Sequence, residues 1–457
     1  MPLFTCDEAG CTGAAVRGKA CLLCLRHLCT DHLKRGVHGC PNWQNDAEAE
    51  AWGVANARAT RDEVNALIAT VDARALENHA TLLRGGIACT VVPLAYDAEN
   101  IHHVMGGMNF HITICFADGV EWICRIRRNN VSSPPRSIQN AILNSEVATL
   151  KFLASIRVPV PQVHGYATFG DNNPVGVGYI LMDKLPGRPL DLDAANAEQK
   201  RRFMSRFAEI FATLAAHPFL AIGSPLLSTL NQAVVGPVAS ETFAPALGSQ
   251  ILLGPFDSAT EYRRTALEIA IELIRRQELY VDTSIDAYLV HRFLLDKLPL
   301  LDAADTSGGS GFYLKHMDDK GDHIMVDDDF NITGIIDWER AQTVPKAEAF
   351  AAPLFMLDVA EYYSGVNELS ATESTFVEVL KEQGHAELAE LVSRGRVQHR
   401  IMHCINGDVD DPDFPNIFMA LLRLLPEQDA PTDSWDFWRA WTLRRFEDDP
   451  GLQALFA

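Results

Sequence analysis

The sequence contains no stretch that is both long and uncharged enough to span a bilayer, although apolar residues make up 47% of it. Its beginning, MPLFTCDEAGC, lacks the basic segment and the long apolar segment of a secretory signal peptide. No internal repeat or low-complexity block interrupts the 457 residues, a length that suits two or three domains. These absences predict a soluble protein of the cytoplasm that does not enter a membrane.

Positively charged residues are scarce. The chain has 39 Lys and Arg against 60 Asp and Glu, which gives a formal net charge of −21 at pH 7. General nucleic-acid binding depends on Lys and Arg that neutralise phosphates. We therefore expect no nucleic-acid partner, whereas a cationic ligand is compatible with this charge.

Cysteine is scarce beyond residue 40, where only four of the ten cysteines lie. The other six are clustered at the amino terminus with histidines at ligand-like spacing. In an intracellular chain such a cluster indicates metal rather than disulfides. Eight thiolate and imidazole ligands suit two tetrahedral zinc ions, which would supply the folding energy of so small a module. The candidate ligands are Cys6, Cys11, Cys21, Cys24, Cys29, His32, His38 and Cys40.

The run C-x2-C-x4-C-x2-H-x5-H-x-C, together with the cysteines before it, resembles the AN-one-type zinc finger, a cross-brace module. The resemblance implies a zinc finger over residues 1–43 with two ligand sets: Cys6, Cys11, Cys29 and His32 on one zinc, and Cys21, Cys24, His38 and Cys40 on the other. The first pair is spaced x4 here, where the family has x2. His27 is a spare imidazole, and a redox-sensitive or disordered tail is the alternative. The module would serve a protein partner or a purely structural role.

The most informative stretch is 314–340, LKHMDDKGDHIMVDDDFNITGIIDWER. Two short β-rich runs, Ile324–Val326 and 332–336, flank the acidic turn 327–331. This pattern predicts a β-hairpin. The hairpin would bring the loop before it close to the Asp-Trp-Glu sequence after it.

The hairpin would place Asp318 near Asp337, with His323 between them in sequence. Phosphoryl transfer needs one carboxylate to orient the attacking hydroxyl and another to hold the metal that bridges the phosphates. The stretch resembles the aminoglycoside phosphotransferase (choline kinase-like) family, which shows H-x-D-x-x-x-x-N and then I-D-W on a protein kinase-like fold. The resemblance implies a catalytic role for Asp318, supported by His316, and Mg²⁺ binding by Asp337. His323 stands where the family has its metal-binding asparagine, although imidazole is a poor ligand for Mg²⁺.

Residues 86–183 read as a β-rich amino-terminal lobe. The glycine turn at Gly106 and Gly107 lets backbone approach phosphates closely, and with Asn109 it resembles the family's nucleotide-covering loop. Arg125 matches the cation of the third strand, with solvated charge as the rival interpretation for Arg127 and Arg128. Glu146 matches the helical glutamate that pairs with the strand cation.

Three further segments complete the expected α+β, bilobal architecture. Residues 44–85 read as a linker helix that runs to about Leu83, and residues 184–457 as a helical carboxy-terminal lobe with the catalytic loop and the acceptor site. By resemblance, backbone of Met182 to Lys184 would meet the adenine of ATP at the hinge between the lobes. Asp358, Glu361 and the run 408–414 could meet a cationic acceptor or form acidic surface.

These patterns together predict an ATP- and Mg²⁺-dependent phosphotransferase that acts on a hydroxyl group of a small molecule. The alternative is a catalytically weak pseudokinase or scaffold that recruits a protein through its zinc finger. The histidine at 323 and the arginine at 125 favour the alternative, whereas the intact Asp318 and Asp337 oppose it. A protein kinase is a weaker third interpretation, because no glycine follows Asp337 directly.

Overall fold

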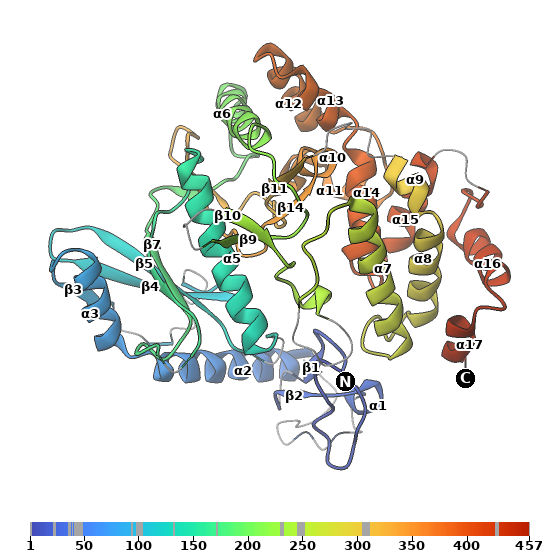
Figure 1. The fold of residues 1–457 in the computed structure, drawn as a ribbon, viewed down its shortest axis with the longest axis horizontal. Coiled ribbons are helices and arrows are strands. Elements are labelled where there is room, and N and C mark those ends of the chain that lie inside the picture. The colour runs from blue at the N-terminus through green and yellow to red at the C-terminus, as the bar shows by residue number, and fades with distance from the viewer. Residues whose placement is uncertain are drawn as a thin grey trace.

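A computed structural model describes residues 2–21, 24–34, 38, 40, 49–92, 95–96, 104–130, 133–170, 172–228, 233–244, 252–303, 311–425 and 429–456. Figure 1 shows a small amino-terminal module beneath two larger parts, one built around a sheet and the other built mainly of helices. No helix in these ranges is long and apolar enough to cross a bilayer.

The amino-terminal module contains little regular structure. Strands β1 (Ala20–Cys21) and β2 (Arg26–His27) form an antiparallel pair, and the short helix α1 (Thr30–Leu33) follows. Its buried side chains are few: Cys6, Ala15, Val16 and Leu28. Two long helices then lead into the sheet, α2 (Ala49–Thr70) and α3 (Ala73–Leu83).

The small lobe is a five-stranded antiparallel sheet in the order β3-β4-β5-β7-β6. Alternate residues of its strands face a core that also contains Val64 and Leu67 of α2 and Leu76 and Ala80 of α3. The opposite face packs on α5. The elements are β3 (Cys89–Val91), β4 (Asn109–Phe116), β5 (Glu121–Arg127), α5 (Arg136–Ser155), β6 (Val163–Ala167) and β7 (Tyr179–Asp183).

The predicted linker helix is two helices, which corrects the expectation of one. It breaks at Asp72, whose side chain accepts the Ala75 N–H and so begins α3 as an N-cap. The helices are also part of the small lobe, because they cover one face of its sheet. Glu63 of α2 pairs with Arg128 just after β5 at 2.7 Å.

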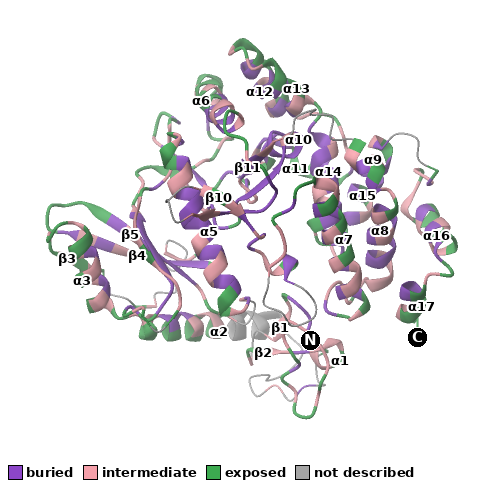
Figure 2. Cartoon of the chain, viewed as in Figure 1, coloured by how far each residue is buried: buried purple, intermediate pink, exposed green. Residues whose placement is uncertain are grey.

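The large lobe is mostly helical around one large apolar core, visible as the purple interior of Figure 2. Its first half contains β8 (Arg188–Pro189), α6 (Ala197–Ala215), β9 (Ser224–Leu227), β10 (Ala233–Gly236), η1 (Glu241–Phe243), α7 (Ala259–Arg275), α8 (Ser284–Asp296) and α9 (Leu298–Ala303). Its second half contains β11 (Phe312–Lys315), β12 (Ile324–Val326), β13 (Ile332–Ile335), β14 (Gln342–Pro345), α10 (Lys346–Ala349), η2 (Leu354–Met356), α11 (Val359–Tyr363), α12 (Ala371–Glu382), α13 (Ala386–Ser393), α14 (Arg396–Asn406), α15 (Phe414–Leu424), α16 (Trp435–Arg445) and α17 (Pro450–Phe456).

The predicted hairpin is present. Strands β12 and β13 pair antiparallel with Ile324 opposite Ile335, and β8 adds a third strand beside β12. The flanking strands β11 and β14 pair with each other, so residues on either side of the hairpin return to the same place. This frame fixes the ends of the stretch 314–340, which we call the catalytic stretch after its predicted role, relative to the lobe core.

Candidate active site

His316 ties the two ends of the hairpin together. Its Nε2 donates to the carbonyl of Ile336 (3.0 Å), and its Nδ1 accepts the backbone N–H of Asp318 (3.3 Å). Burial lowers the pKa of His316, so the ring is neutral and held in one tautomer by these two bonds. His316 therefore braces the loop and is not set up to transfer a proton.

Asp318 and Asp337 stand at the two ends of this hairpin with half-exposed side chains. Both carboxylates act electrostatically on His316, so they share one neighbourhood. Asp337 has a φ of 64°, in the left-handed region that non-glycine residues rarely adopt. Such strain concentrates at functional sites, where the surroundings hold a side chain in an unusual direction.

Lys320 is a cation of this loop that the sequence analysis missed. Its Nζ lies 2.9 Å from Asp318 Oδ1. The hydrogen bond to Asp318 raises the pKa of Lys320, and the fields of Asp322 and Asp337 add to the effect. The loop therefore carries a fixed positive charge beside the carboxylate at 318. Its position two residues after Asp318 was the only signal in the sequence.

Arg125 of β5 joins the small lobe to the catalytic stretch. Its guanidinium pairs with Glu146 of α5 and with Asp337, and lies 3.5 Å from Glu339. The side chains of Arg125 and Glu146 are almost fully buried. The structure thus brings together three residues that the sequence analysis selected separately: the strand cation, the helical glutamate and the carboxylate after the hairpin.

Glu339 is the buried centre of a second group of charges. Its Oε2 accepts from Arg127 Nη1 (2.8 Å) and from Asn109 Nδ2 (3.1 Å). The interpretation of Arg127 as solvated charge is therefore wrong, because its side chain is 6% exposed. Sequence reasoning missed the role of Glu339, although its place two residues after Asp337 put it on the same segment.

His111 is a further missed residue on this face of the sheet. It lies two residues after Asn109 on β4, so the two side chains share one face of the sheet. It is paired directly with Arg125 of β5. Burial, followed by the charge of Arg125, lowers the pKa of His111 to about 4. A neutral imidazole thus lies near Asp337 and Glu339, whose fields also reach it. The alternation of β4 was the signal that could have found it.

His323 does not adopt the geometry of a magnesium ligand. Its ring stacks on His316 with centroids 4.0 Å apart, and its Nδ1 accepts the Gly321 N–H at 3.3 Å. Burial, followed by the electrostatic effects of the neighbouring His316 and Lys320, lowers the pKa of His323 to about 2. In a neutral ring whose Nδ1 accepts a bond, Nε2 carries the hydrogen and offers no lone pair to a metal. The geometry therefore argues against the predicted ligand role of His323.

Gly106 and Gly107 lie in the turn before β4, as expected for a nucleotide-covering loop. Arg128 Nη1 donates to both of their carbonyls, at 2.9 Å and 3.1 Å, so Arg128 is also not a solvated charge. Among the described residues, nothing comes within 4 Å of a Cβ built on Gly107. Packing within the described chain therefore does not require a glycine there.

The family model for the phosphotransferase enzyme family (APH) matches residues 116–350, just over half of the 457 residues. The chain belongs to this family. The matched segment begins in β4 and ends just beyond α10, so it contains β5, α5 and the whole catalytic stretch. The expected fold, α+β with two protein kinase-like lobes, is confirmed.

Two curated relatives are similar over a shorter segment. They are subtelomeric hrmA-associated cluster proteins from two strains of Aspergillus fumigatus, each 30% identical over 151 residues. The match covers 30% of this chain and 28% of each relative. The aligned segment therefore spans less than a third of the relatives' own length.

Solved structures of phosphotransferases are similar in fold at low identity. The GDP complex of aminoglycoside 2'-phosphotransferase-IIIa is 15% identical and has a TM-score of 0.41 over 76% of this chain and 97% of that chain. A Plasmodium vivax ethanolamine kinase is 12% identical, with a TM-score of 0.43 over 71% and 81%. APH(4)-Ia with AMP-PNP and hygromycin B is 13% identical, with a TM-score of 0.44 over 77% and 100%. These scores carry no information about the substrate of the present phosphotransferase.

The predicted hinge of this phosphotransferase is the end of β7. Met182 is buried against α5, and the backbone N–H of Asp183 donates to the Gln162 carbonyl at 3.1 Å. The side chain of Lys184 pairs with Glu121 at 2.7 Å on the surface. Of the backbone groups expected to meet adenine, the N–H of Asp183 is therefore already bonded, and the remaining assignment stays a prediction.

The eight predicted metal ligands of the amino-terminal module form two groups of four. In each group the candidate ligand atoms all lie within 4.8 Å of one another. Both ring nitrogens of His38 are buried without a hydrogen-bond partner, as a ligand awaiting a metal would be. His27 lies outside both groups and stacks on Phe4. The groups are Cys6, Cys11, Cys29 and His32, and Cys21, Cys24, His38 and Cys40.

Two of the acidic residues considered for an acceptor have structural partners. Asp358 caps α11 by accepting the Glu361 N–H at 3.0 Å. In the run 408–414, Asp410 pairs with Lys19 of the amino-terminal module at 2.9 Å. Neither carboxylate is therefore free in the way that a cation site would need.

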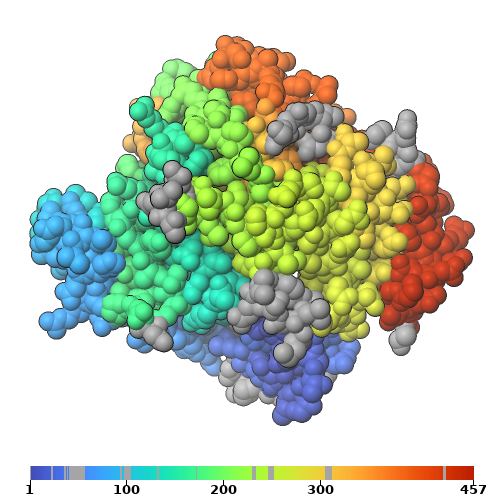
Figure 3. All heavy atoms as spheres, viewed as in Figure 1, coloured from blue at the N-terminus to red at the C-terminus, as the bar shows by residue number. Residues whose placement is uncertain are grey.

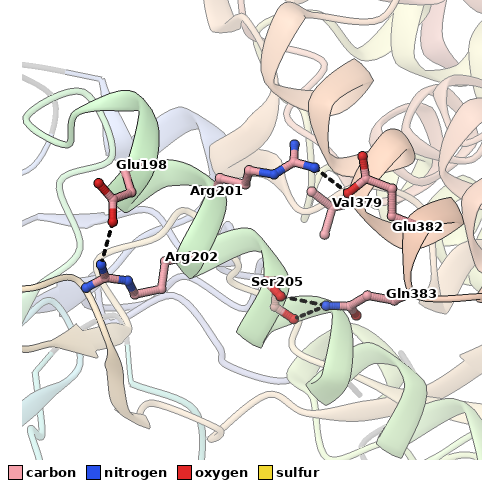
Figure 4. A pocket seen from close by; sticks show the side chains of 7 residues that line it. All are labelled: Glu198, Arg201, Arg202, Ser205, Val379, Glu382 and Gln383. Atoms are coloured by element: carbon pink, nitrogen blue, oxygen red, sulfur yellow. Dashed lines mark hydrogen bonds and ion pairs between the residues drawn. The ribbon is translucent and has the colours of Figure 1, made fainter.

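A surface pocket of about 290 Å³ lies away from these residues, between α6 and α12 (Figure 4). Its charged groups pair with one another. Arg201 pairs with Glu382, Arg202 with Glu198 at 3.0 Å, and Gln383 donates to the Ser205 hydroxyl at 2.6 Å. The pocket offers no unpaired charge among its lining residues, which are Glu198, Arg201, Arg202, Ser205, Val379, Glu382 and Gln383.

Proposed function

We propose that this chain transfers the γ-phosphoryl group of ATP to a hydroxyl group of a small molecule. The observation that carries the proposal is the hairpin with Asp318 before its first strand and Asp337 after its second, together with Arg125, which pairs with Asp337 and Glu146. Family membership supports phosphoryl transfer as the reaction class. Catalysis of this kind consists mainly of positioning and of neutralising charge, which these residues are suited to do.

The candidate site offers one carboxylate, that of Asp337, as a ligand for Mg²⁺. Mg²⁺ is usually bound in such sites by one or two carboxylates together with substrate phosphates and water. Asp337 supplies a half-exposed carboxylate, whereas the Nδ1 lone pair of His323 already accepts the Gly321 N–H. When bound, Mg²⁺ would neutralise negative charge on the phosphates. Arg125, Gly106, Gly107 and Asn109 would hold the phosphates from the small lobe.

Asp318 would accept the proton of the attacking hydroxyl. Its neighbour Lys320 pairs with the carboxylate, and His316 fixes the backbone of the loop. The exposed carboxylate of Asp318 leaves room for an acceptor hydroxyl within hydrogen-bond reach. The acceptor class that we propose is a small-molecule alcohol.

The test is an ADP-release assay with a panel of aminoglycosides, choline, ethanolamine and amino sugars. We expect at least one acceptor to raise ADP release above the rate without acceptor. Asp318→Asn should lower that turnover by at least about 100-fold, because a positioned base contributes this much. ATP affinity should be unchanged. An equally active variant would remove Asp318 from the mechanism.

A pseudokinase or scaffold is the second candidate, and the geometry of His323 favours it. A site with a single metal carboxylate could bind nucleotide and turn over slowly. His323→Asn restores the residue of the family motif. If the wild type releases no ADP with any acceptor and His323→Asn does, the chain is a weakened member of the family.

We also propose that the amino-terminal module binds two structural zinc ions. Three cysteines and one histidine in each group are a donor set that zinc prefers. Burial raises the pKa of the Cys6 thiol, but hydrogen bonds from the backbone of Cys29 and Glu8 outweigh it and lower the pKa to about 7. Metal analysis of the purified chain should find about two zinc ions per chain, the number that two four-ligand sites hold.

A further inference from the structure

The amino-terminal module is docked on the large lobe through a buried arginine. Arg17 Nε lies 3.2 Å from Glu278 Oε2, and the two side chains are 7% and 0% exposed. The backbone N–H of Arg17 also donates to the Glu278 carbonyl at 2.8 Å. A surface contact would leave both charges in water, so this pair belongs to a formed interface. Figure 3 shows the module lying directly below the α7 region of the large lobe.

Further contacts surround this pair. Lys19 Nζ lies 2.9 Å from both Asp282 and Asp410, and Thr30 Oγ1 donates to the Gln277 carbonyl at 3.4 Å. The module therefore contacts the turn between α7 and α8. The face that does so carries Arg17, Lys19 and Thr30, and we call it the docking face.

The module also reaches α5, the helix that carries Glu146. Leu3 packs against a small apolar cluster that contains Ile138 and Ile142 of α5. Arg17 Nη1 donates to the carbonyl of Glu241 (3.1 Å), next to the same cluster. The module thus packs against the apolar cluster at the amino-terminal half of α5, one to two turns before Glu146.

A chain of charges leads from the docking face toward the catalytic residues. Burial raises the pKa of Glu241. The charges of Arg340, Arg127 and Arg17 act on the same carboxyl group and oppose this rise. Arg127 in turn pairs with Glu339, which lies 3.5 Å from Arg125. Electrostatic interactions therefore link Arg17 of the module through Glu241 to Arg127, and the carboxylate of Glu339 links Arg127 to Arg125.

The residues of the docking face lie among the candidate zinc ligands in the sequence. Arg17 and Lys19 lie between the ligands Cys11 and Cys21, in a segment held by bonds such as Val16 N–H to the Leu28 carbonyl. The module has only two-residue strands and a handful of buried side chains. Modules of this size fold when they bind metal and are unfolded without it.

We propose that the partner of the zinc module is the catalytic body of its own chain, and that zinc loading keeps α5 in place for the Arg125–Glu146 pair. This inference rests on the zinc part of the proposed function. It replaces the expectation of an external protein partner with an intramolecular one. Zinc then acts on the phosphotransferase site through packing, without contact with the nucleotide.

Hydrogen exchange on the full-length chain tests this proposal without using activity. Zinc-loaded protein is compared with protein after chelation, and amide protection is measured in α5, in the α7–α8 turn and in α12. Chelation should speed exchange in the first half of α5 and in the turn by at least about tenfold, since local opening sets these rates. Exchange in α12, on the far side of the large lobe, should not change.

Variants separate docking from metal binding. Arg17→Ala keeps all eight ligands, so it should retain its zinc and yet show fast α5 exchange whether or not zinc is present. Because Arg17→Ala removes the nearer charge partner of buried Glu278 and leaves only Arg276 at 3.7 Å, Arg17→Met combined with Glu278→Gln provides a second variant without that charge. Arg61→Ala, which removes an exposed pair on α2, is the matched control and should behave as wild type.

One result would overturn the proposal directly: chelation that unfolds residues 2–34 while α5 keeps its protection. A chain that binds no zinc would overturn it together with the zinc assignment. Failure to bind ATP would count against the phosphotransferase proposal alone, because the exchange result does not involve nucleotide.

Discussion

Glu339 shows how single residues hold the two lobes together. It belongs to the catalytic stretch of the large lobe, and its carboxylate accepts from Asn109 and Arg127 of the small-lobe sheet. Arg125 makes the parallel link from the same sheet to Asp337. Two buried arginines are therefore paired with carboxylates of one short segment of the other lobe, and Arg125 has a further partner, Glu146, in its own lobe.

Glu339→Gln should destabilise the protein by about 3 kcal/mol or more, because it leaves the buried guanidinium of Arg127 without its charge partner. Urea unfolding measures the change. Glu382→Gln removes an exposed partner of Arg201 and should cost at most about 1 kcal/mol. Equal losses for the two variants would contradict the buried role of Glu339.

Neutral histidines are a second feature at the scale of residues. Burial lowers the pKa of His111 to about 4 and of His323 to about 2, and it also lowers the pKa of His316. In the unfolded chain these imidazoles titrate near pH 6.5. Below that pH the unfolded state binds protons that the folded state does not. Stability is therefore complete above about pH 6.5 and falls as the pH is lowered toward the folded values.

His323→Asn should weaken this acid sensitivity. A histidine whose folded pKa is about 2 costs the folded state about 2 kcal/mol between pH 7 and pH 5. The free energy of unfolding, measured in urea at both pH values, should therefore differ less in the variant by about this amount. An unchanged difference would mean that His323 is protonated in the folded protein.

At the scale of elements, the sequence pattern correctly predicted the helices and strands that depend mainly on neighbouring residues. The hairpin of β12 and β13 follows from two β-rich runs around an acidic turn, and both strands lie where they were expected. Strand β5 and helix α5, with Arg125 and Glu146, follow from alternation and amphipathic spacing. The break at Asp72 was missed because a single capping residue inside a helical pattern looks like any other polar position.

Helices α2 and α3 behave as part of the small lobe, and Leu76 of α3 tests this. The side chain is fully buried beneath the sheet, so Leu76→Ala should cost about 3 kcal/mol in the free energy of unfolding. Leu82→Ala changes a residue of the same helix that is 75% exposed and should have an effect within about 0.5 kcal/mol. A small loss at both positions would mean that α3 is a detachable linker.

At the scale of the molecule, few contacts could be predicted from the sequence, because the residues that make them are far apart in the chain. Arg17 and Glu278 are separated by 261 positions, and no periodic pattern relates them. The same holds for Asn109 and Glu339, separated by 230 positions. Ligand spacing could anticipate the composition of both metal groups, whereas the surface on which the module docks could come only from the folded structure.

The catalytic stretch could be anticipated because one hairpin carries nearly all of it. Asp318, His316 and Asp337 lie within 22 residues of sequence, and the turn between them is fixed by local geometry. Lys320 and His111 were missed because a lone lysine or histidine has no distinctive pattern. Their significance comes from the carboxylates and the arginine that folding brings beside them.

The measurement that tests the central claim most directly is calorimetric titration of the zinc-loaded chain with ATP, with and without Mg²⁺. Mg²⁺ should tighten ATP binding at least about tenfold, or by about 1.4 kcal/mol. Asp337→Asn, which tolerates the left-handed backbone at this position, should bind ATP with the same affinity whether or not Mg²⁺ is present. An ATP affinity of the wild type that is the same with and without Mg²⁺ would contradict the assignment of Asp337 and of the phosphotransferase site around it. So would an Asp337→Asn variant that keeps the full Mg²⁺ dependence.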